Sequence, residues 1–197
     1  LRRALQSLVS SGLLVSSHGR GWYVAMEAHQ EFPQTLESFS ETAARLGLQA
    51  SSDVLRAEEA SATLDQAEEL SIAPGSKLFH LVRIRKLDGV PVAIDASYFP
   101  ALGELKLPMA DFTTASLFRI MSDAGIELTR AESTIEAQGA DAVTAKHLGI
   151  EPGMPILTMH QLIEDSTGKP LISSTIRYAG DRYRLRTSFN RIAKAGS

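Results

Sequence analysis

Apolar residues near the start of the chain recur at the i, i+4, i+7, i+8 spacing of one helix face, and Gly12 stands where such a helix ends. These residues are Leu1, Leu5, Leu8 and Val9. Two short β-prone runs follow at residues 13–16 and 22–25, and the glycine-rich residues 17–21 between them are typical of a hairpin tip. A helix followed by a hairpin predicts half of a winged helix-turn-helix, over residues 1–26.

A second, larger domain follows a short linker. Residues 27–34 show no periodicity and contain Pro33, which disfavours helix just before it, so we predict the linker there. The second domain then covers residues 35–197. Its first helix is marked by a capping box, with Ser38 as the N-cap and Glu41 three residues later.

The rest of this domain mixes short helical segments with longer β-prone ones. We predict further helices at residues 63–71, 102–106, 114–124 and 141–148. We predict strands at residues 48–59, 77–87, 90–99, 127–138, 155–166, 169–178 and 183–189. Short turns join most of these segments, which predicts an α+β fold with an antiparallel sheet flanked by helices.

Part of the sequence recurs later in the chain at a constant offset. The first copy contains Ala67, Leu70, Ile72, Pro74, Gly75 and Leu78, and the second contains Ala145, Leu148, Ile150, Pro152, Gly153 and Ile156. After a slippage by a single position, Gly89 and Pro91 recur as Gly168 and Pro170. We therefore predict two similar units in one pseudo-symmetric sheet. A cleft between such halves is a natural ligand site, although a duplication is equally compatible with a purely structural origin.

Charge is distributed unevenly along a chain whose net charge is only -3. Residues 1–26 hold three arginines and no acidic residue, so the front of the chain is basic and the body is acidic. No apolar run approaches the roughly 20 residues of a membrane span, and no signal peptide opens the sequence. We therefore expect a cytoplasmic protein that does not enter the membrane.

The residues that most often bind metals or carry out catalysis do not cluster in this sequence. The chain has no cysteine, and its five histidines show no metal-ligand spacing. It offers no Ser-His-Asp order and no phosphate-binding glycine loop. We therefore predict no metal, no cofactor and no catalytic residue.

Arg83 and Arg85 project from the same face of the predicted strand 77–87, which is apolar on both faces. An unpaired cation is costly in such a place, so the two guanidinium groups require an anion. Structural ion pairs with acidic neighbours meet this requirement as well as a bidentate clamp for a bound phosphate, phosphonate or carboxylate does.

The turn that follows this strand decides whether Asp95 joins the two arginines. A two-residue loop at Asp88 and Gly89 puts Asp95 on the opposite face, whereas a three-residue loop with Gly89 in a left-handed bulge keeps the odd-numbered residues together. We favour the bulge. Asp95 then accepts hydrogen bonds from a ligand or neutralises Arg83.

Several blocks of the sequence resemble those of GntR-family transcriptional regulators of the HutC/UTRA subfamily. The blocks that resemble the end of a recognition helix and a wing are Leu1-Arg2-Arg3-Ala4-Leu5, Gly12-Leu13-Leu14 and Gly19-Arg20-Gly21-Trp22-Tyr23-Val24. The blocks that resemble the UTRA effector domain are Arg83-Ile84-Arg85, Asp88-Gly89-Val90-Pro91, Tyr98-Phe99-Pro100 and Tyr178-Ala179-Gly180-Asp181-Arg182-Tyr183. They follow one another in the expected order over nearly the whole chain.

The resemblance implies a chorismate-lyase-like UTRA fold, a homodimer, and a repressor whose binding to operator DNA is modulated by a small anionic effector. The chain opens inside the predicted recognition helix, so we expect the winged helix to be truncated at its N-terminus. The residues expected to contact DNA are Arg2, Arg3, Gly19, Arg20 and Gly21. A dimerisation module with a vestigial pocket and a lyase-like enzyme are the alternative functions.

The resemblance also implies which residues bind the effector. The expected set is Phe39, Ser40, Arg83, Arg85, Asp95, Ser116, Ile172, Ser174 and Tyr178. Ser40 and Ser116 combine a hydroxyl with a helix N-terminus, which favours an anion. Ile172 stands where sugar-phosphate sensors of this family have a glutamate, and an apolar side chain cannot bind a polyol. We therefore expect a less hydroxylated anion, such as a small carboxylate, a phosphonate or a urocanate-like acid.

Overall fold

The computed structural model describes residues 4–5, 14–17, 21–24, 29–31, 36–101, 107 and 110–185. The strands are β1 (Leu14–Ser17), β2 (Gly21–Val24), β3 (His29–Glu31), β4 (Ala50–Ser61), β5 (Lys77–Leu87), β6 (Val90–Pro100), β7 (Leu128–Gly139), β8 (Pro155–Asp165), β9 (Pro170–Ala179) and β10 (Tyr183–Leu185). The helices with assigned bounds are α2 (Phe39–Arg45), α3 (Leu64–Glu69), α4 (Leu117–Asp123) and α5 (Ala142–Leu148).

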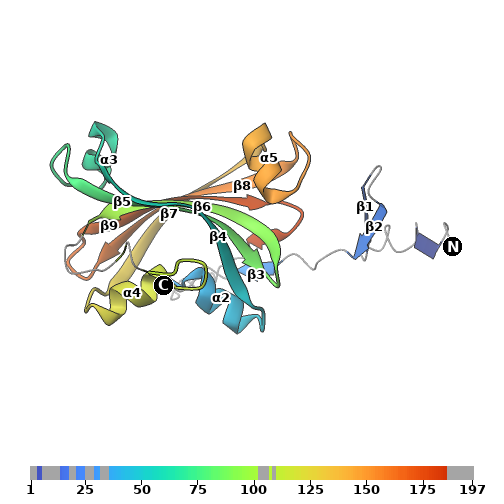
Figure 1. The fold of residues 1–197 in the computed structure, drawn as a ribbon, viewed down its shortest axis with the longest axis horizontal. Helices are drawn as coiled ribbons and strands as arrows, with labels where there is room; N and C mark the ends of the chain where they lie inside the picture. The colour runs from blue at the N-terminus through green and yellow to red at the C-terminus, as the bar shows by residue number, and fades with distance from the viewer. Residues whose placement is uncertain are drawn as a thin grey trace, which may run out of the picture.

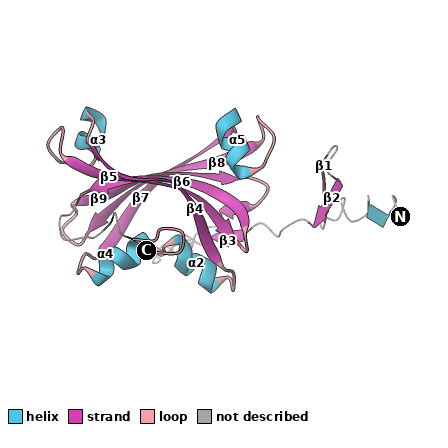
Figure 2. Ribbon diagram, in the orientation of Figure 1, coloured by secondary structure: helices cyan, strands magenta, loops and turns pink. Residues whose placement is uncertain are grey.

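A six-stranded antiparallel sheet in the order β4-β5-β6-β9-β8-β7 forms the centre of the fold. Helices α2 and α4 lie on one face of this sheet, and α3 and α5 lie on the other (Figure 1). Figure 2 shows the same division, with each helix at one end of the twisted sheet. The predicted α+β class, an antiparallel sheet flanked by helices, is therefore confirmed. None of the described helices is both long and apolar enough to cross a membrane.

The sheet consists of two repeats that meet at its centre. The order α2-β4-α3-β5-β6 recurs as α4-β7-α5-β8-β9, and the strands β6 and β9 pair with each other between the two halves. The offset seen in the sequence, that from Ala67 to Ala145, also separates the first residues of α2 and α4 and those of β4 and β7. The predicted duplication is thus present, and it also includes the helix and strand that precede the residues used to detect it.

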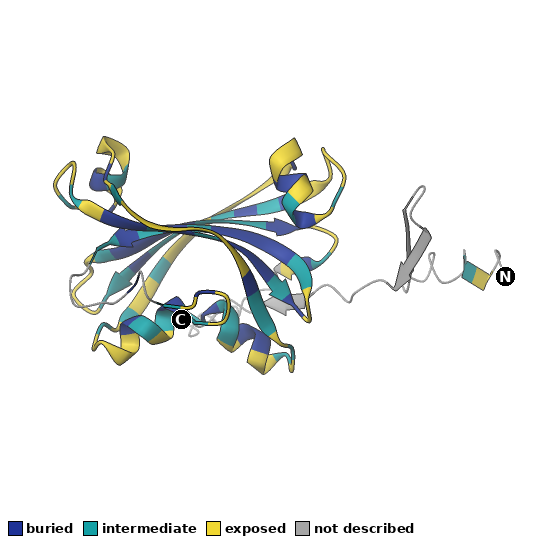
Figure 3. Ribbon diagram, in the orientation of Figure 1, coloured by how far each residue is buried: buried dark blue, intermediate teal, exposed yellow. Residues whose placement is uncertain are grey.

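Figure 3 shows buried residues along the central strands of the sheet. Because alternate residues of a strand point to opposite faces, both faces of the sheet carry a core. On β5, the buried Phe79 and Leu81 pack with Phe112 and Met121 on the face of α4. Leu78 points to the other face and packs under α3. Burial of both faces explains why the sequence of β5 is largely apolar at odd and even positions alike.

Side-chain caps set the starts of the helices. Ser38 and Glu41 form the predicted capping box of α2, with Ser38 N donating to Glu41 Oε2 at 2.7 Å. The helix predicted at 114–124 begins later, at Leu117, and Ser116 is its N-cap rather than part of its first turn. The preceding residues form a turn, in which the Asp111 carboxylate accepts hydrogen bonds from Thr113.

The N-terminal hairpin is present as β1 and β2, which pair antiparallel from Leu14 opposite Val24 to Ser17 opposite Gly21. Within the predicted linker, β3 pairs in parallel with β10, so this segment is not without secondary structure. The helix predicted at 102–106 and the end of the strand predicted at 183–189 lie outside the described residues. So do Arg2, Arg3, Gly19 and Arg20 of the predicted DNA-contact set.

Candidate functional site

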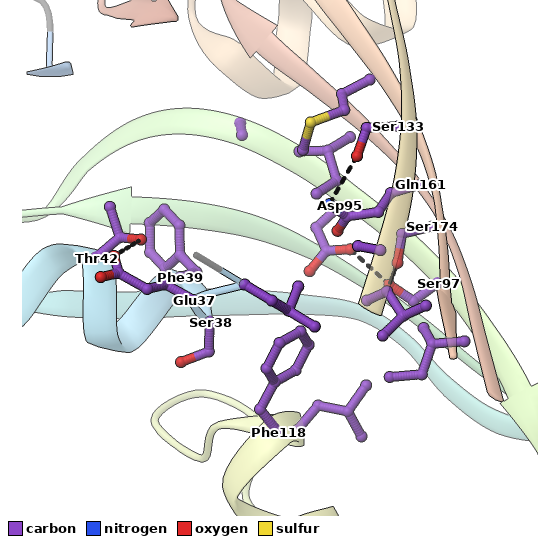
Figure 4. A pocket seen from close by; sticks show the side chains of 18 of the residues that line it. Glu37, Ser38, Phe39, Thr42, Asp95, Ser97, Phe118, Ser133, Gln161 and Ser174 are labelled. Carbon is purple, nitrogen blue, oxygen red and sulfur yellow. Dashed lines mark hydrogen bonds between the residues drawn. The ribbon is translucent and has the colours of Figure 1, made fainter. Parts of the chain in front are cut away.

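A cavity of about 370 Å³ lies between the sheet and the helices α2 and α4. Its floor consists of side chains from β5 to β9, and its walls include Phe39 of α2 and Phe118 of α4 (Figure 4). Because the two helices occupy equivalent positions in the two repeats, the cavity spans both halves of the duplicated domain.

Polar side chains form a row across the sheet beneath the cavity, at positions that the strand pairing places next to one another. Arg85 pairs with Ser52 of β4, and Arg83 pairs with Asp95 of β6. Ser97 pairs with Ser174 of β9. Ser174 in turn pairs with Gln161 of β8, and Gln161 with Ser133 of β7. The row therefore reaches from one edge of the sheet to the other.

A buried hydrogen-bond network is centred on the carboxylate of Asp95. Arg83 Nη2 donates to Asp95 Oδ2 at 2.8 Å, and Ser97 Oγ donates to Asp95 Oδ1 at 2.7 Å. Ser97 Oγ also lies 2.8 Å from Ser174 Oγ (Figure 4). Burial raises the pKa of Asp95, but the charges of Arg83 and Arg85 and the hydrogen bond from Ser97 outweigh it, and the pKa lies below its ordinary value.

Arg85 lacks the close carboxylate contact that Arg83 makes with Asp95. Its Nη1 donates to Ser52 Oγ at 3.0 Å, while its Nε lies 3.9 Å from Asp95 Oδ2. Its guanidinium carbon lies 4.3 Å from the centre of the Phe39 ring, which is the geometry of a cation–π contact. Burial, followed by the charge of Arg83, lowers the pKa of Arg85 to about 10, so the side chain stays cationic at neutral pH.

Two guanidinium groups share a single carboxylate at this place. Among the described residues, Nε and Nη1 of Arg83 and Nε of Arg85 are buried and have no hydrogen-bond partner. The other charged residues that line the cavity are half-buried or exposed: Arg45 is paired with Glu37, and Arg130 with Glu164. The buried part of the site thus carries one more positive charge than negative, and an unsatisfied cation there favours an anion.

The turn between β5 and β6 differs from the predicted one. Leu87 pairs with Val90, so the loop has two residues, Asp88 and Gly89, both with positive φ. The bulge lies inside β6 instead, where Val92 is the extra residue between Lys86 opposite Pro91 and Arg85 opposite Ala93. The bulge restores the alternation, so Asp95 still faces Arg83.

The structure brings most of the predicted effector-binding residues to this cavity. Those that line it are Phe39, Arg83, Arg85, Asp95, Ser116, Ile172, Ser174 and Tyr178. Ser40 does not line the cavity, and Ser38 does so in its place. The hydroxyl groups of Ser38 and Ser116 accept hydrogen bonds from the backbone of their own helices, so both serines act as helix caps.

Sequence reasoning missed several polar residues of the row. Ser97 lies two residues after Asp95 on the same strand face, which was a usable signal. Gln161 follows Arg83 by the same offset that relates the two repeats, which was a second signal. Ser52 and Ser133 carried no signal, because only the register of the edge strands β4 and β7 places them in the row.

The segment from Tyr178 to Tyr183 contacts the strands β6 and β8 beside the site. A Cβ at Gly180 would lie 2.6 Å from the carbonyl oxygen of Pro155, so only glycine fits there. Arg182 Nη1 donates to the carbonyl oxygens of Pro91 and Leu148, both at 2.7 Å, and ties the end of α5 to the start of β6. The ring of Tyr178 stacks on that of Tyr183 with 3.7 Å between the centroids.

Comparison with known proteins identifies the family. The model of the UTRA domain matches residues 45–184. The chain belongs to the UTRA family. The matched range holds Arg83, Arg85, Asp95 and Tyr178 and most of the cavity floor.

Relatives of this UTRA chain are transcriptional regulators. It is 28% identical over 183 residues to the HTH-type transcriptional repressor NagR of Bacillus subtilis, covering 93% of this chain and 75% of the relative. It is 28% identical to the histidine utilization repressor of Pseudomonas putida, covering 97% of this chain and 76% of the relative. The crystal structure of PhnF from Mycobacterium smegmatis aligns with a TM-score of 0.78 and 25% identity, covering 96% of this chain and 83% of that one.

These comparisons confirm the predicted resemblance to GntR regulators of the HutC/UTRA subfamily. They also favour a regulator over the lyase-like enzyme, since the named relatives are transcriptional repressors. Among the described residues, no group of three His, Cys, Asp or Glu side chains is placed to hold a metal ion.

Proposed function

We propose that this chain is the effector-responsive part of a DNA-binding repressor, and that the cavity under α2 and α4 binds a small anionic effector. The observation that carries the proposal is the buried pair Arg83 and Arg85, which shares one carboxylate and keeps guanidinium N–H groups without partners. A carboxylate, phosphonate or phosphate satisfies both the charge and the donors. If Arg83 and Arg85 only formed structural ion pairs, we would expect a second acidic residue beside them.

Apolar side chains in the floor of the cavity favour a ligand with few hydroxyl groups. Ile172 is almost fully buried in the apolar cluster beneath the cavity together with Ile163, and Ile176 lines the floor nearer Tyr178. These side chains offer no hydrogen bonds to a polyol. We therefore propose a small carboxylate or phosphonate rather than a sugar phosphate as the effector.

We also propose that the protein binds operator DNA, forms a homodimer and acts in the bacterial cytoplasm. The named relatives are repressors, which supports DNA as the partner, and the basic residues of the winged-helix segment 1–26 are the proposed contacts. A homodimer suits an operator with two half-sites. The boundaries 1–26, 27–34 and 35–197 stay predictions.

We propose that Phe39 couples effector binding to the segment that contacts DNA. It lines the cavity at the start of α2 and contacts Arg85, while β3 precedes α2 in the chain. An anion that moves Arg85 alters the contact with Phe39 and thereby biases the position of α2 and the linker.

Thermal unfolding of the chain with a panel of anions tests this function. The panel contains phosphosugars, phosphonates, dicarboxylates and urocanate-like acids. A selective ligand at one hundred times its Kd stabilises the fold by about 2.7 kcal/mol. We expect a shift with a subset of anions that is lost in Arg85→Met and kept in Arg56→Met, whose arginine lies on β4 away from the cavity. If no anion shifts the wild type, the chain is instead a dimerisation module with a vestigial pocket.

A further inference from the structure

The duplication places an uncharged counterpart of the arginine site in the other half of the cavity. Gln161 on β8 is the equivalent of Arg83, at the offset that relates Ala67 to Ala145. Ser174 on β9 is the equivalent of Asp95, at the slightly longer offset that relates Gly89 to Gly168 after the hairpin. All four of these polar side chains line the same cavity. The second half therefore keeps the arrangement of the first with neutral groups in place of the ion pair.

The carboxylate of Asp95 sets the direction of the hydrogen bonds that lead toward this second half. An ionised carboxylate only accepts, so the single hydroxyl proton of Ser97 goes to Asp95. In the contact between Ser97 and Ser174, the proton therefore belongs to Ser174. Ser174 has donated its only proton and offers lone pairs alone to a ligand.

Gln161 also offers an acceptor. Its Nε2 donates to Ser133 Oγ at 3.1 Å (Figure 4), and among the described residues its Oε1 receives no hydrogen bond. The side chain is half-buried and lines the cavity. Two acceptors, the carbonyl oxygen of Gln161 and the hydroxyl oxygen of Ser174, thus lie on paired residues of neighbouring strands.

The charge of the cavity decides what kind of donor they accept. Four arginines and two carboxylates line the cavity, and this net positive charge disfavours a cationic donor group on the ligand. We propose that Gln161 and Ser174 form a second subsite, which accepts a hydrogen bond from an uncharged O–H or N–H group of the effector. This inference rests on the proposed function, because the anionic end of the same ligand lies at Arg83 and Arg85. The effector class is then a molecule with a single anionic group at one end and a neutral donor at the other.

Two series of rigid probes test the subsite by calorimetric titration of the full chain. One series is benzoate with a hydroxymethyl, methoxymethyl or ethyl group at position 3 or 4, and the other is the same set built on phenylphosphonate. The hydroxymethyl group donates, the methoxymethyl group only accepts, and the ethyl group does neither. We expect one hydroxymethyl isomer to bind about ten times more tightly than its methoxymethyl and ethyl analogues, the fold-change of one neutral hydrogen bond.

Gln161→Leu should bring this preference below about twofold while the unsubstituted anion binds as before. Gln138→Leu is the matched control, because Gln138 lies on β7 and does not line the cavity. A further probe carries a cationic aminomethyl group in place of the hydroxymethyl group. In Gln161→Glu, the added carboxylate should shift the preference to this aminomethyl analogue. The inference is wrong if the anions bind without a hydroxymethyl preference, or if that preference survives Gln161→Leu. If neither unsubstituted anion nor inorganic phosphate binds the wild type, the proposed function itself fails.

Discussion

The guanidinium carbon of Arg85 lies 4.3 Å from the centre of the Phe39 ring, so a buried cation of the sheet faces an aromatic residue at the start of α2. The ring holds the guanidinium on one side, and Ser52 holds it on another. The Arg85 guanidinium is therefore held both by the sheet, through Ser52, and by helix α2, through Phe39.

Phe39→Leu should weaken anion binding by about 0.5–2 kcal/mol, because it keeps an apolar side chain but removes the aromatic face from Arg85. Titration with the anion that stabilises the wild type measures the loss. Phe118→Leu is the control, since Phe118 lines the same cavity from α4. Equal losses in both variants would mean that only the volume of the wall matters.

The two arginines should respond in opposite ways to replacement by methionine. Arg83→Met leaves Asp95 without its close partner and should cost about 3–5 kcal/mol of unfolding free energy. Arg85→Met leaves the pair of Arg83 and Asp95 intact and removes an incompletely paired buried cation, so the ligand-free chain should gain roughly 1–3 kcal/mol. Urea denaturation of both variants measures the difference. A large loss in Arg85→Met would mark that residue as a structural ion-pair partner.

Asp95→Asn should destabilise the chain at neutral pH, and the deficit should shrink in acid. The pKa of Asp95 in the folded chain is lower than in the unfolded chain, so its stabilisation is complete above the unfolded pKa of about 3.9. It is lost as the pH falls from there through the folded pKa. Unfolding free energies of both proteins between pH 7 and pH 3 test this. A deficit that stays constant over the whole range would contradict it.

Gly180→Ala should destabilise the fold by roughly 1–3 kcal/mol, because the new Cβ would lie 2.6 Å from the backbone of Pro155. Gly139→Ala is the matched control, since its Cβ would meet Gly153 at an ordinary 3.4 Å. Thermal unfolding of the two variants gives the comparison. Similar melting temperatures would show that β8 and the end of β9 can move apart at little cost.

Local patterns in the sequence were sufficient for much of the fold. Apolar alternation located the central strands within about two residues, the capping box located the start of α2, and the internal repeat revealed the two halves of the sheet. The same alternation placed Arg83 and Arg85 on one buried face. These features depend on residues close together in the chain or on direct self-similarity.

Only the tertiary structure decided how the site is assembled. The bulge at Val92 puts Asp95 opposite Arg83, although the two-residue turn alone would have turned it away. Ser52 and Ser133 reach the polar row through strand pairing alone, and Ser38 rather than Ser40 faces the cavity. The family resemblance supplied the outline of the site, whereas its partners were set by register. Register depends on the packing of whole strands against both helical layers, so no local pattern in the sequence contains it.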